Sequence, residues 1–307
     1  MKQEPWISID KMVVGCDGRP AEKDDALRVW LRHQESCKAC GSKRNGGGEL
    51  VYGFKDAGIH VTVAPRFRVR GYEITFNANT VDLDVLRTLA SKTLNPKVTS
   101  LEVAIDYPSL IATDWLLFTP YFLENNGYSY QDDDEATPHS LCRGAKRSPR
   151  QWKKYDKIRW MIDTYSWDYT IRDCTGEIHT LADYDDLMRL ELAVSGEKRI
   201  LGVEQFKGIV LVNRHTDIHS PGNNLTRIGI RRILEDSTYY ARLPKRLRHT
   251  YLKHMSNPKI VHNMQPSPYM MYRQHLPMLR KRLVLLMEPF GGYVNPHWLP
   301  LDERRVS

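Results

Sequence analysis

Residues 187–194, LMRLELAV, carry the pattern that decides the fold. From Met188 onward every second side chain is aliphatic, whereas Arg189 and Glu191 occupy positions between them. Successive side chains of an extended chain point to opposite sides. This period of two residues therefore predicts a β-strand with one buried face and one polar face.

Four other stretches show the same alternation: GIHVTVA (58–64), GYEITFN (71–77), SLEVAID (100–106) and RQWKKYDK (150–157). An antiparallel sheet with one face packed against helices produces such strands. Contact with water explains the polar side of any single strand. Five strands together place an unusual set of side chains there: His60, Glu73, Glu102, Asp106, Lys153, Tyr155, Lys157, Arg189 and Glu191. We therefore expect an α+β fold with a central antiparallel sheet, helices on one face and an active site on the other.

Apolar residues recur at helical spacing over 81–94, and a further helix is expected around 110–123. After about residue 226 the pattern becomes helical and is interrupted by prolines. We expect two parts, an α+β domain over 1–225 and a basic, mainly helical C-terminal region over 226–307.

Positive charge is concentrated in that C-terminal region. The chain has a net charge of +8, and residues 227–287 contain 13 Lys and Arg against two acidic residues. Such a block favours a polyanionic partner, nucleic acid above all, over a merely solvated helix surface. Lys245, Arg246 and Arg248 lie among tyrosines and are candidate phosphate contacts.

The sequence predicts a protein of the cytoplasm, without a membrane span or a secretory signal. Five cysteines, an odd number, argue against a disulfide framework. His33, Cys37, Cys40 and Cys16 offer a structural zinc site as an alternative. Only one Cys-x-x-Cys pair is present, however, and a strong zinc signal needs two.

The segment GAKRSPRQWKKYDK (144–157) resembles a motif of rolling-circle replication initiators, which leads through basic residues to Tyr-Asp-Lys on a strand. An acidic strand upstream, here SLEVAID, and an Arg-x-Glu downstream, here Arg189-Leu-Glu191, are similar to motifs of the same family. The three occur in the order found in staphylococcal plasmid initiators (the Rep_trans group) and filamentous-phage gene II-type initiators. Ser100 and Glu102 depart from the Arg and Asp usual in that family.

The resemblance implies a nickase that initiates replication at an origin. Tyr155 would attack a phosphodiester, remain joined to the 5′ phosphate and later allow strand rejoining. Lys146, Arg147 and Arg150 would contact DNA. Origin DNA, both double- and single-stranded, and the replication machinery of a bacterial host would be the partners, and a homodimer is a further expectation.

The residues suit this chemistry. A phenol is a weak nucleophile at neutral pH, and we expect Lys153 and Lys157 to favour its ionised form. A divalent cation, Mg²⁺ or Mn²⁺, would polarise the phosphate. Candidate ligands are Glu102 and Glu191, then Asp106, Glu73 and His60.

Two other functions remain open from sequence alone. A non-enzymatic DNA-binding regulator would use the basic region and have no need for Tyr155 and its facing carboxylates. A relaxase or recombinase would apply the same tyrosine chemistry to another substrate. The chain has no phosphate-binding loop of the P-loop type, so an ATPase or helicase domain is not expected.

Overall fold

The computed structural model describes residues 4–21, 24–44, 49–63, 71–118, 127–130, 140–143, 150–164, 169–196, 199–219, 224–257, 259–261 and 266–292. Within this part of the chain, no helix is long and apolar enough to cross a membrane.

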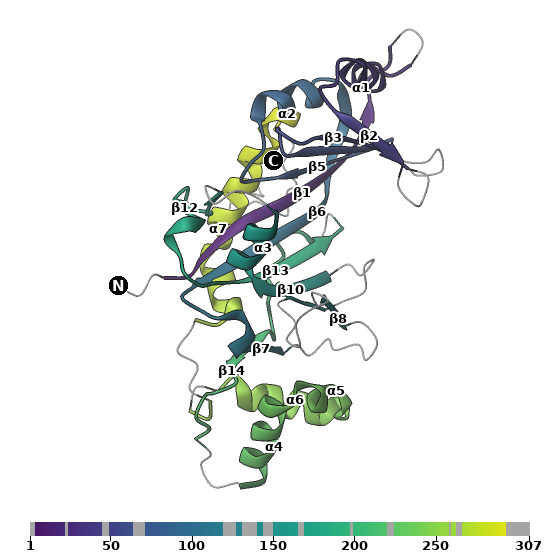
Figure 1. Ribbon diagram of the computed structural model, residues 1–307. Helices are drawn as coiled ribbons and strands as arrows, with labels where there is room; N and C mark the ends of the chain where they lie inside the picture. The colour runs from purple at the N-terminus through teal and green to yellow at the C-terminus, as the bar shows by residue number, and fades with distance from the viewer. Residues whose placement is uncertain are drawn as a thin grey trace.

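A ten-stranded sheet forms the centre of the molecule, and every strand pairs with its neighbours in antiparallel fashion (Figure 1). The expected α+β class with a central antiparallel sheet is confirmed. The strands, in spatial order, are β2 (Gly41–Arg44), β3 (Leu50–Phe54), β4 (Ile59–Val63), β5 (Tyr72–Asn77), β1 (Trp6–Gly18), β6 (Thr93–Pro108), β13 (Leu187–Ser195), β10 (Arg150–Asp156), β9 (Ser140–Arg143) and β8 (Gly127–Tyr130).

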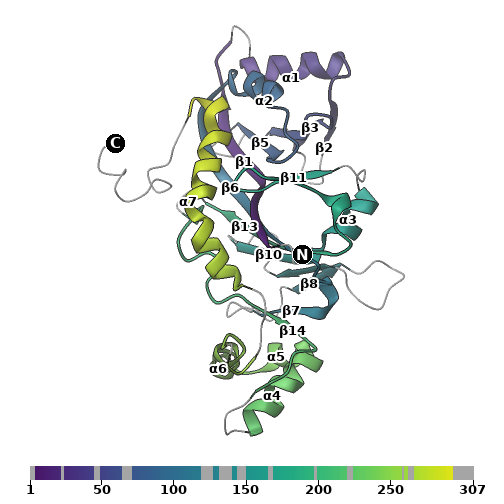
Figure 2. The ribbon, with the colours of Figure 1, turned by 90° about the vertical axis from the view of Figure 1, so that its left-hand side faces the viewer.

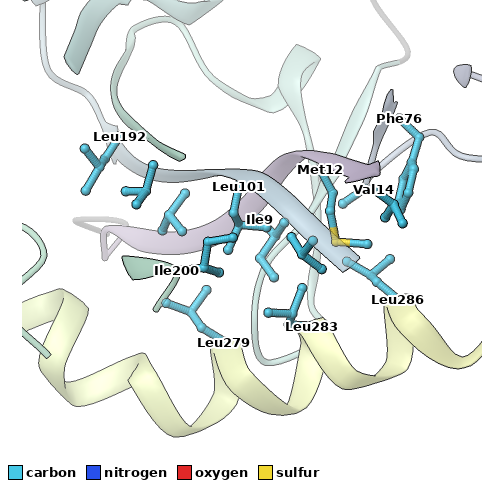
Figure 3. Packing of buried hydrophobic residues seen from close by; sticks show 14 of the residues in the cluster. Ile9, Met12, Val14, Phe76, Leu101, Leu192, Ile200, Leu279, Leu283 and Leu286 are labelled. Carbon is cyan, nitrogen blue, oxygen red and sulfur yellow. The ribbon is translucent and has the colours of Figure 1, made fainter. Parts of the chain in front are cut away.

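The apolar face of this sheet is covered by helices. The long helix α7 (Pro268–Met287) packs Leu279, Leu283 and Leu286 against side chains of the central strands, among them Ile9 and Met12 (Figure 3). Helices α1 (Ala26–Ser36) and α2 (Leu83–Ala90) contribute buried leucines to the same core. The alternation of the strands therefore has its physical cause in this burial.

The polar face lies on the opposite side from α7 (Figure 2). Helix α3 (Lys157–Thr164) and the hairpin of β11 (Thr170–Arg172) and β12 (Ile178–Thr180) cover part of it. The sequence predicted a strand through Lys157, but β10 ends at Asp156. Asp156 accepts a hydrogen bond from the backbone N–H of Arg159 at 3.0 Å, the usual arrangement of a helix N-cap, so α3 begins there instead.

A second hydrophobic cluster lies at one end of the molecule (Figure 1). It joins α4 (Asn224–Glu235), α5 (Ser237–Arg242) and α6 (Lys245–Met255) to a two-stranded sheet of β7 (Trp115–Phe118) and β14 (Val210–Asn213). Gly229 permits the close approach of α4 and α6, because a Cβ atom there would collide with the ring of Tyr251.

One expectation changes as a result. The helix expected around 110–123 is wrong over the described residues, where a short 3-10 turn (Ala112–Asp114) leads into β7. Pairing with β14, distant in the chain, overrides the local pattern. The described helices of the basic C-terminal region divide between the two clusters, since α7 belongs to the core of the main sheet.

Candidate active site

Strand register brings the predicted residues of three neighbouring strands into adjacent positions on the polar face. On β10 and β13, Tyr155 lies opposite Arg189, and Lys153 lies opposite Glu191. On the next strand, β6, Asp106 lies opposite Arg189. The alternation along each strand then directs all these side chains to one side of the sheet.

A chain of contacts links Tyr155 to two carboxylates. The Tyr155 hydroxyl donates a hydrogen bond to Oε1 of Glu191. Lys153 Nζ donates to Oε2 of Glu191 at 3.3 Å and to Oε1 of Glu102 at 3.2 Å. Tyr155 and Glu191 are buried, with 8% and 3% of their surface exposed, so water screens this arrangement weakly.

The electrostatics differ from the expectation that lysines favour the phenolate. Burial and the negative charge of Glu191 raise the pKa of Tyr155 well above its usual value. Lys153 does not offset this because it is paired with Glu191 and Glu102, which raise its own pKa against the effect of burial. In this arrangement the phenol is protonated at neutral pH, and Glu191 is the group placed to accept its proton.

Lys157 lies beside Tyr155 although it belongs to a helix rather than the strand. Its ammonium group is 4.0 Å from the ring centroid of Trp160, 5.4 Å from that of Tyr169 and 5.9 Å from that of Tyr155. Only 1% of the residue is exposed. Burial, together with the charge of Arg189, lowers the pKa of Lys157 to about 8. The aromatic faces partly replace the water that this cation loses.

Arg189 holds the centre of the polar face together. Its Nε and Nη2 atoms donate to the two oxygens of Asp106 at 2.7 and 2.8 Å, and Nη1 donates to Asp10 at 2.6 Å. Burial opposes the charge, but Asp106 and Asp10 raise the pKa of Arg189 well above its usual value. The guanidinium thus joins β13, β6 and β1 in a buried ion cluster.

Asp10 was missed by the sequence reasoning. Its stretch, WISID (6–10), alternates in the same way as the five strands considered, and that signal would have identified it. The sheet register shifts between Ile9 and Lys11, which marks Asp10 as an irregular position in β1. Burial opposes ionisation, but Arg189 and Lys157 keep the pKa of Asp10 below its usual value.

The predicted metal ligands do not all come together. Asp106 is already held by Arg189. On β1, the partner of Glu73 is Gly15 and the partner of Glu102 is Lys11. Because these partners are four residues apart, Glu73 and Glu102 are separated by about 13 Å along the strand direction. His60 is on β4, three strands from β6, or about 14 Å across the sheet.

Glu102 and Glu191 remain the pair that suits a divalent cation. Both contact the same ammonium group, so their oxygens already converge on one cation. Burial, then the nearby charge of Glu191, raises the pKa of Glu102. A divalent cation held by both carboxylates would take the place of the Lys153 ammonium group.

The candidate zinc ligands and the basic residues 146–150 are the next predicted groups. Cys16 and Cys40 are buried, and Cys37 is exposed with its sulfur 3.7 Å from Nε2 of His33. Among the described residues, the group with metal-ligand geometry is Asp173, Glu177 and His179, and it includes none of the four candidates for a zinc site. Lys146, Arg147 and the side chain of Arg150 lie outside the described residues.

The basic residues of α6 differ in accessibility. Lys245 and Arg246 are exposed at the start of the helix, whereas Arg248 is half-buried. The backbone carbonyl of Arg248 lies 3.4 Å from the Tyr240 hydroxyl in the second hydrophobic cluster. Lys245 and Arg246 are therefore more accessible to solvent than Arg248.

Comparison with known proteins gives a likeness at the level of structure. No protein-family model matches the chain, and no curated protein matches it. The solved structure of a rolling circle replication initiator protein from Geobacillus stearothermophilus is similar, with 12% sequence identity and a TM-score of 0.37. The similarity covers 64% of this chain and 77% of that one. At this level of similarity, function has to be inferred from the site itself.

Proposed function

We propose that this protein initiates rolling-circle DNA replication by nicking one strand at an origin, with Tyr155 as the nucleophile. One observation carries the proposal: the Tyr155 hydroxyl donates to Glu191, and Lys153 bridges that carboxylate to Glu102. An adjacent base within hydrogen-bond reach is one of the arrangements that activate a nucleophile for covalent catalysis.

The proposed reaction moves one proton and exchanges one ester bond. Glu191 takes the phenol proton while the Tyr155 oxygen attacks phosphorus. The bond from phosphorus to the 3′ oxygen breaks, and the proton passes to that oxygen, leaving a 3′ hydroxyl and a 5′-phosphotyrosine. The reverse reaction rejoins a strand.

Cations on the polar face support this step electrostatically. With a pKa of about 8, Lys157 is mostly charged at neutral pH and lies within 5.9 Å of the Tyr155 ring centroid. It is placed to counter the charge that develops on the phosphate. Arg189 stays paired with Asp106 and Asp10, so we assign it to positioning the strands rather than to binding DNA.

A divalent cation completes the proposal. Glu102 and Glu191 would hold Mg²⁺ or Mn²⁺, and oxygen ligands are the ones these ions prefer. When bound, the ion would act as a Lewis acid on the phosphate. Asp106 is paired with Arg189, so we do not assign it as a metal ligand.

DNA would reach Tyr155 past α3. The Trp160 ring is tilted against that of Tyr155 with centroids 6.0 Å apart, and Trp160 itself is 39% exposed. An exposed aromatic ring beside a catalytic group suits stacking with an unpaired base. We infer that a single-stranded segment enters here, while duplex origin DNA contacts the basic helices. Host replication proteins of a bacterial cytoplasm and a second copy of the chain are further proposed partners.

The decisive experiment is incubation with the supercoiled replicon that encodes the protein, with and without Mn²⁺. The proposal predicts nicked circles that carry protein on the 5′ end. Supercoiled DNA that stays intact at every metal concentration would contradict it.

A non-enzymatic DNA-binding protein is the second candidate. Its supporting observation is that Lys153 and Arg189 already satisfy the buried carboxylates, as in a purely structural ion cluster. Specific retention of origin DNA without any nick would favour that function.

A further inference from the structure

The turn between β11 and β12 gathers three metal-ligating side chains that take no part in the contacts of Tyr155 described above. β11 and β12 pair through three residue pairs, from Thr170–Thr180 to Arg172–Ile178. Asp173, Glu177 and His179 each offer one ligand atom, and these atoms lie within 4.8 Å of one another.

The Asp173 carboxylate is held in a fixed orientation. Its Oδ1 accepts hydrogen bonds from the backbone N–H groups of Thr175, Gly176 and Glu177 at 2.9 Å each, and from the Thr175 hydroxyl at 2.7 Å. These bonds explain the turn but leave Oδ2 unused. Oδ2 faces His179 Nε2 across 3.6 Å, which is too long for a hydrogen bond.

His179 is equally fixed and has one unsatisfied nitrogen. Its side chain is 10% exposed and stacks on Trp6 with centroids 3.9 Å apart and an angle of 7° between the rings. Nδ1 lies 3.2 Å from the Tyr184 hydroxyl, whereas buried Nε2 has no hydrogen-bond partner among the described residues. If Nδ1 donates to Tyr184, the lone pair of Nε2 faces an oxygen lone pair of Asp173. Two facing acceptors require a cation between them.

We propose that this turn binds a divalent transition-metal ion, of the Zn²⁺ or Mn²⁺ class, through His179 Nε2, Asp173 Oδ2 and the Glu177 carboxylate. One imidazole and two carboxylates form a common ligand set for such ions, and water would complete the coordination. Tyr184 would act as the outer partner that fixes the His179 ring and its tautomer, as is usual for metal-bound histidines. Exposed Glu177 provides the side from which the ion enters.

The ion would link the turn to β12 within the hairpin, and a backbone hydrogen bond ties the hairpin to β1. Cys174 N–H donates to the Ile7 carbonyl on β1 at 2.8 Å, and Leu181 N–H donates to the Tyr169 carbonyl at 3.1 Å. Tyr169 in turn lies beside Lys157. The site is therefore structural in kind and independent of whether the protein nicks DNA.

Metal titration of the full-length protein tests the proposal. Zn²⁺ and Mn²⁺ binding would be measured by calorimetry, with Mn²⁺ also counted by electron paramagnetic resonance. We expect Glu177→Gln to weaken one of the bound equivalents by at least about tenfold, because it removes a ligand without disturbing a buried group. His179→Gln should abolish the same equivalent. Asp183→Asn, a charge-matched change on an exposed residue nearby, should leave binding unchanged.

Two comparisons make the result unambiguous. Glu102→Gln would affect only an ion bound at the polar-face pair, so the two sites are distinguished within one set of titrations. The proposal is overturned if the wild type binds neither metal, or if Glu177→Gln binds both as tightly as the wild type. In either case the contact between His179 and Asp173 involves no metal ion.

Discussion

At the scale of single residues, Tyr155 has the most demanding environment. Tyr155→Phe removes one oxygen, so we expect nicking and the covalent protein–DNA adduct to disappear while DNA binding persists. Loss of the buried hydrogen bond to Glu191 should lower the free energy of unfolding by about 1–3 kcal/mol. Adduct formation on a radiolabelled origin strand is the measurement. Tyr169→Phe is the matched control, and loss of the adduct there instead would assign the nucleophile to Tyr169.

The two convergent carboxylates give a second prediction. Glu102→Gln and Glu191→Gln should each abolish nicking, the first by removing a metal ligand and the second by also removing the base next to Tyr155. Glu73→Gln makes the same change about 13 Å along the polar face and should leave the rate unchanged. Cleavage rates over a Mn²⁺ titration check this. Equal rates for all three variants would exclude Glu102 and Glu191 as ligands.

Lys154 yields a prediction about pH. It points to the opposite side from Tyr155, is 8% exposed and donates to the Ala112 carbonyl. Burial, then the charge of Arg214, lowers its pKa from 10.5 to about 8. Between pH 8 and 10.5 the unfolded chain therefore binds more protons at this site, and stability rises with pH.

The expected gain from pH 8 to 10 is about 2 kcal/mol for the wild type relative to Lys154→Met. Subtracting the free energy of unfolding of the variant from that of the wild type removes the contributions of the other titrating groups. Urea unfolding at several pH values measures it, and parallel pH profiles for the two proteins would contradict the assignment.

At the scale of elements, the Arg189 cluster joins three strands that are far apart in the chain. Arg189→Met should cost about 3–5 kcal/mol, because Asp106 and Asp10 would remain buried without their cation. Adding Asp106→Leu should recover part of this loss, since it removes one of the stranded charges. Arg199→Met, at an exposed position, is the control. Denaturant unfolding gives the comparison, and a cost below about 1 kcal/mol for Arg189→Met would mean that water enters the cluster.

At the scale of the whole molecule, the proposed function places DNA cleavage on the polar face of the sheet and duplex binding on α6, at one end of the molecule (Figure 1). Lys245→Ala with Arg246→Ala should weaken binding to specific and nonspecific duplexes alike. Each lost phosphate contact should flatten the slope of log affinity against log salt by about 0.9. Arg248 should contribute less, since it is half-buried. Cleavage of a short single-stranded substrate should change little.

The control for that variant uses charge at the far end of the sheet. Lys55→Ala with Arg87→Ala removes two exposed positive charges near the end of the sheet where α2 lies. Salt slopes that fall equally in both double variants would show a general charge effect and remove α6 from the proposed DNA interface.

Much of the sheet could be predicted from sequence, because the burial of one face imposes a period that neighbouring residues display on their own. LMRLELAV and SLEVAID are paired strands, and their polar positions, Arg189, Glu191 and Glu102, lie on one face. The shared position of Lys153, Tyr155 and Glu191 also followed from alternation, given that β10 and β13 are neighbours. Local periodicity was sufficient to predict which face of the sheet a side chain occupies.

Only the tertiary structure decided which strands are neighbours and which polar groups satisfy one another. Alternation cannot reveal that Arg189 forms ion pairs with Asp106 and Asp10, or that Lys153 lies between two glutamates. These pairings depend on which strands are neighbours. Lys157 lies in a helix rather than a strand because Asp156 caps that helix. Residues 115–118 form a strand rather than a helix because β14 pairs with them. Burial then set the pKa of Tyr155, since desolvation depends on what packs above the sheet and leaves no trace in the local sequence.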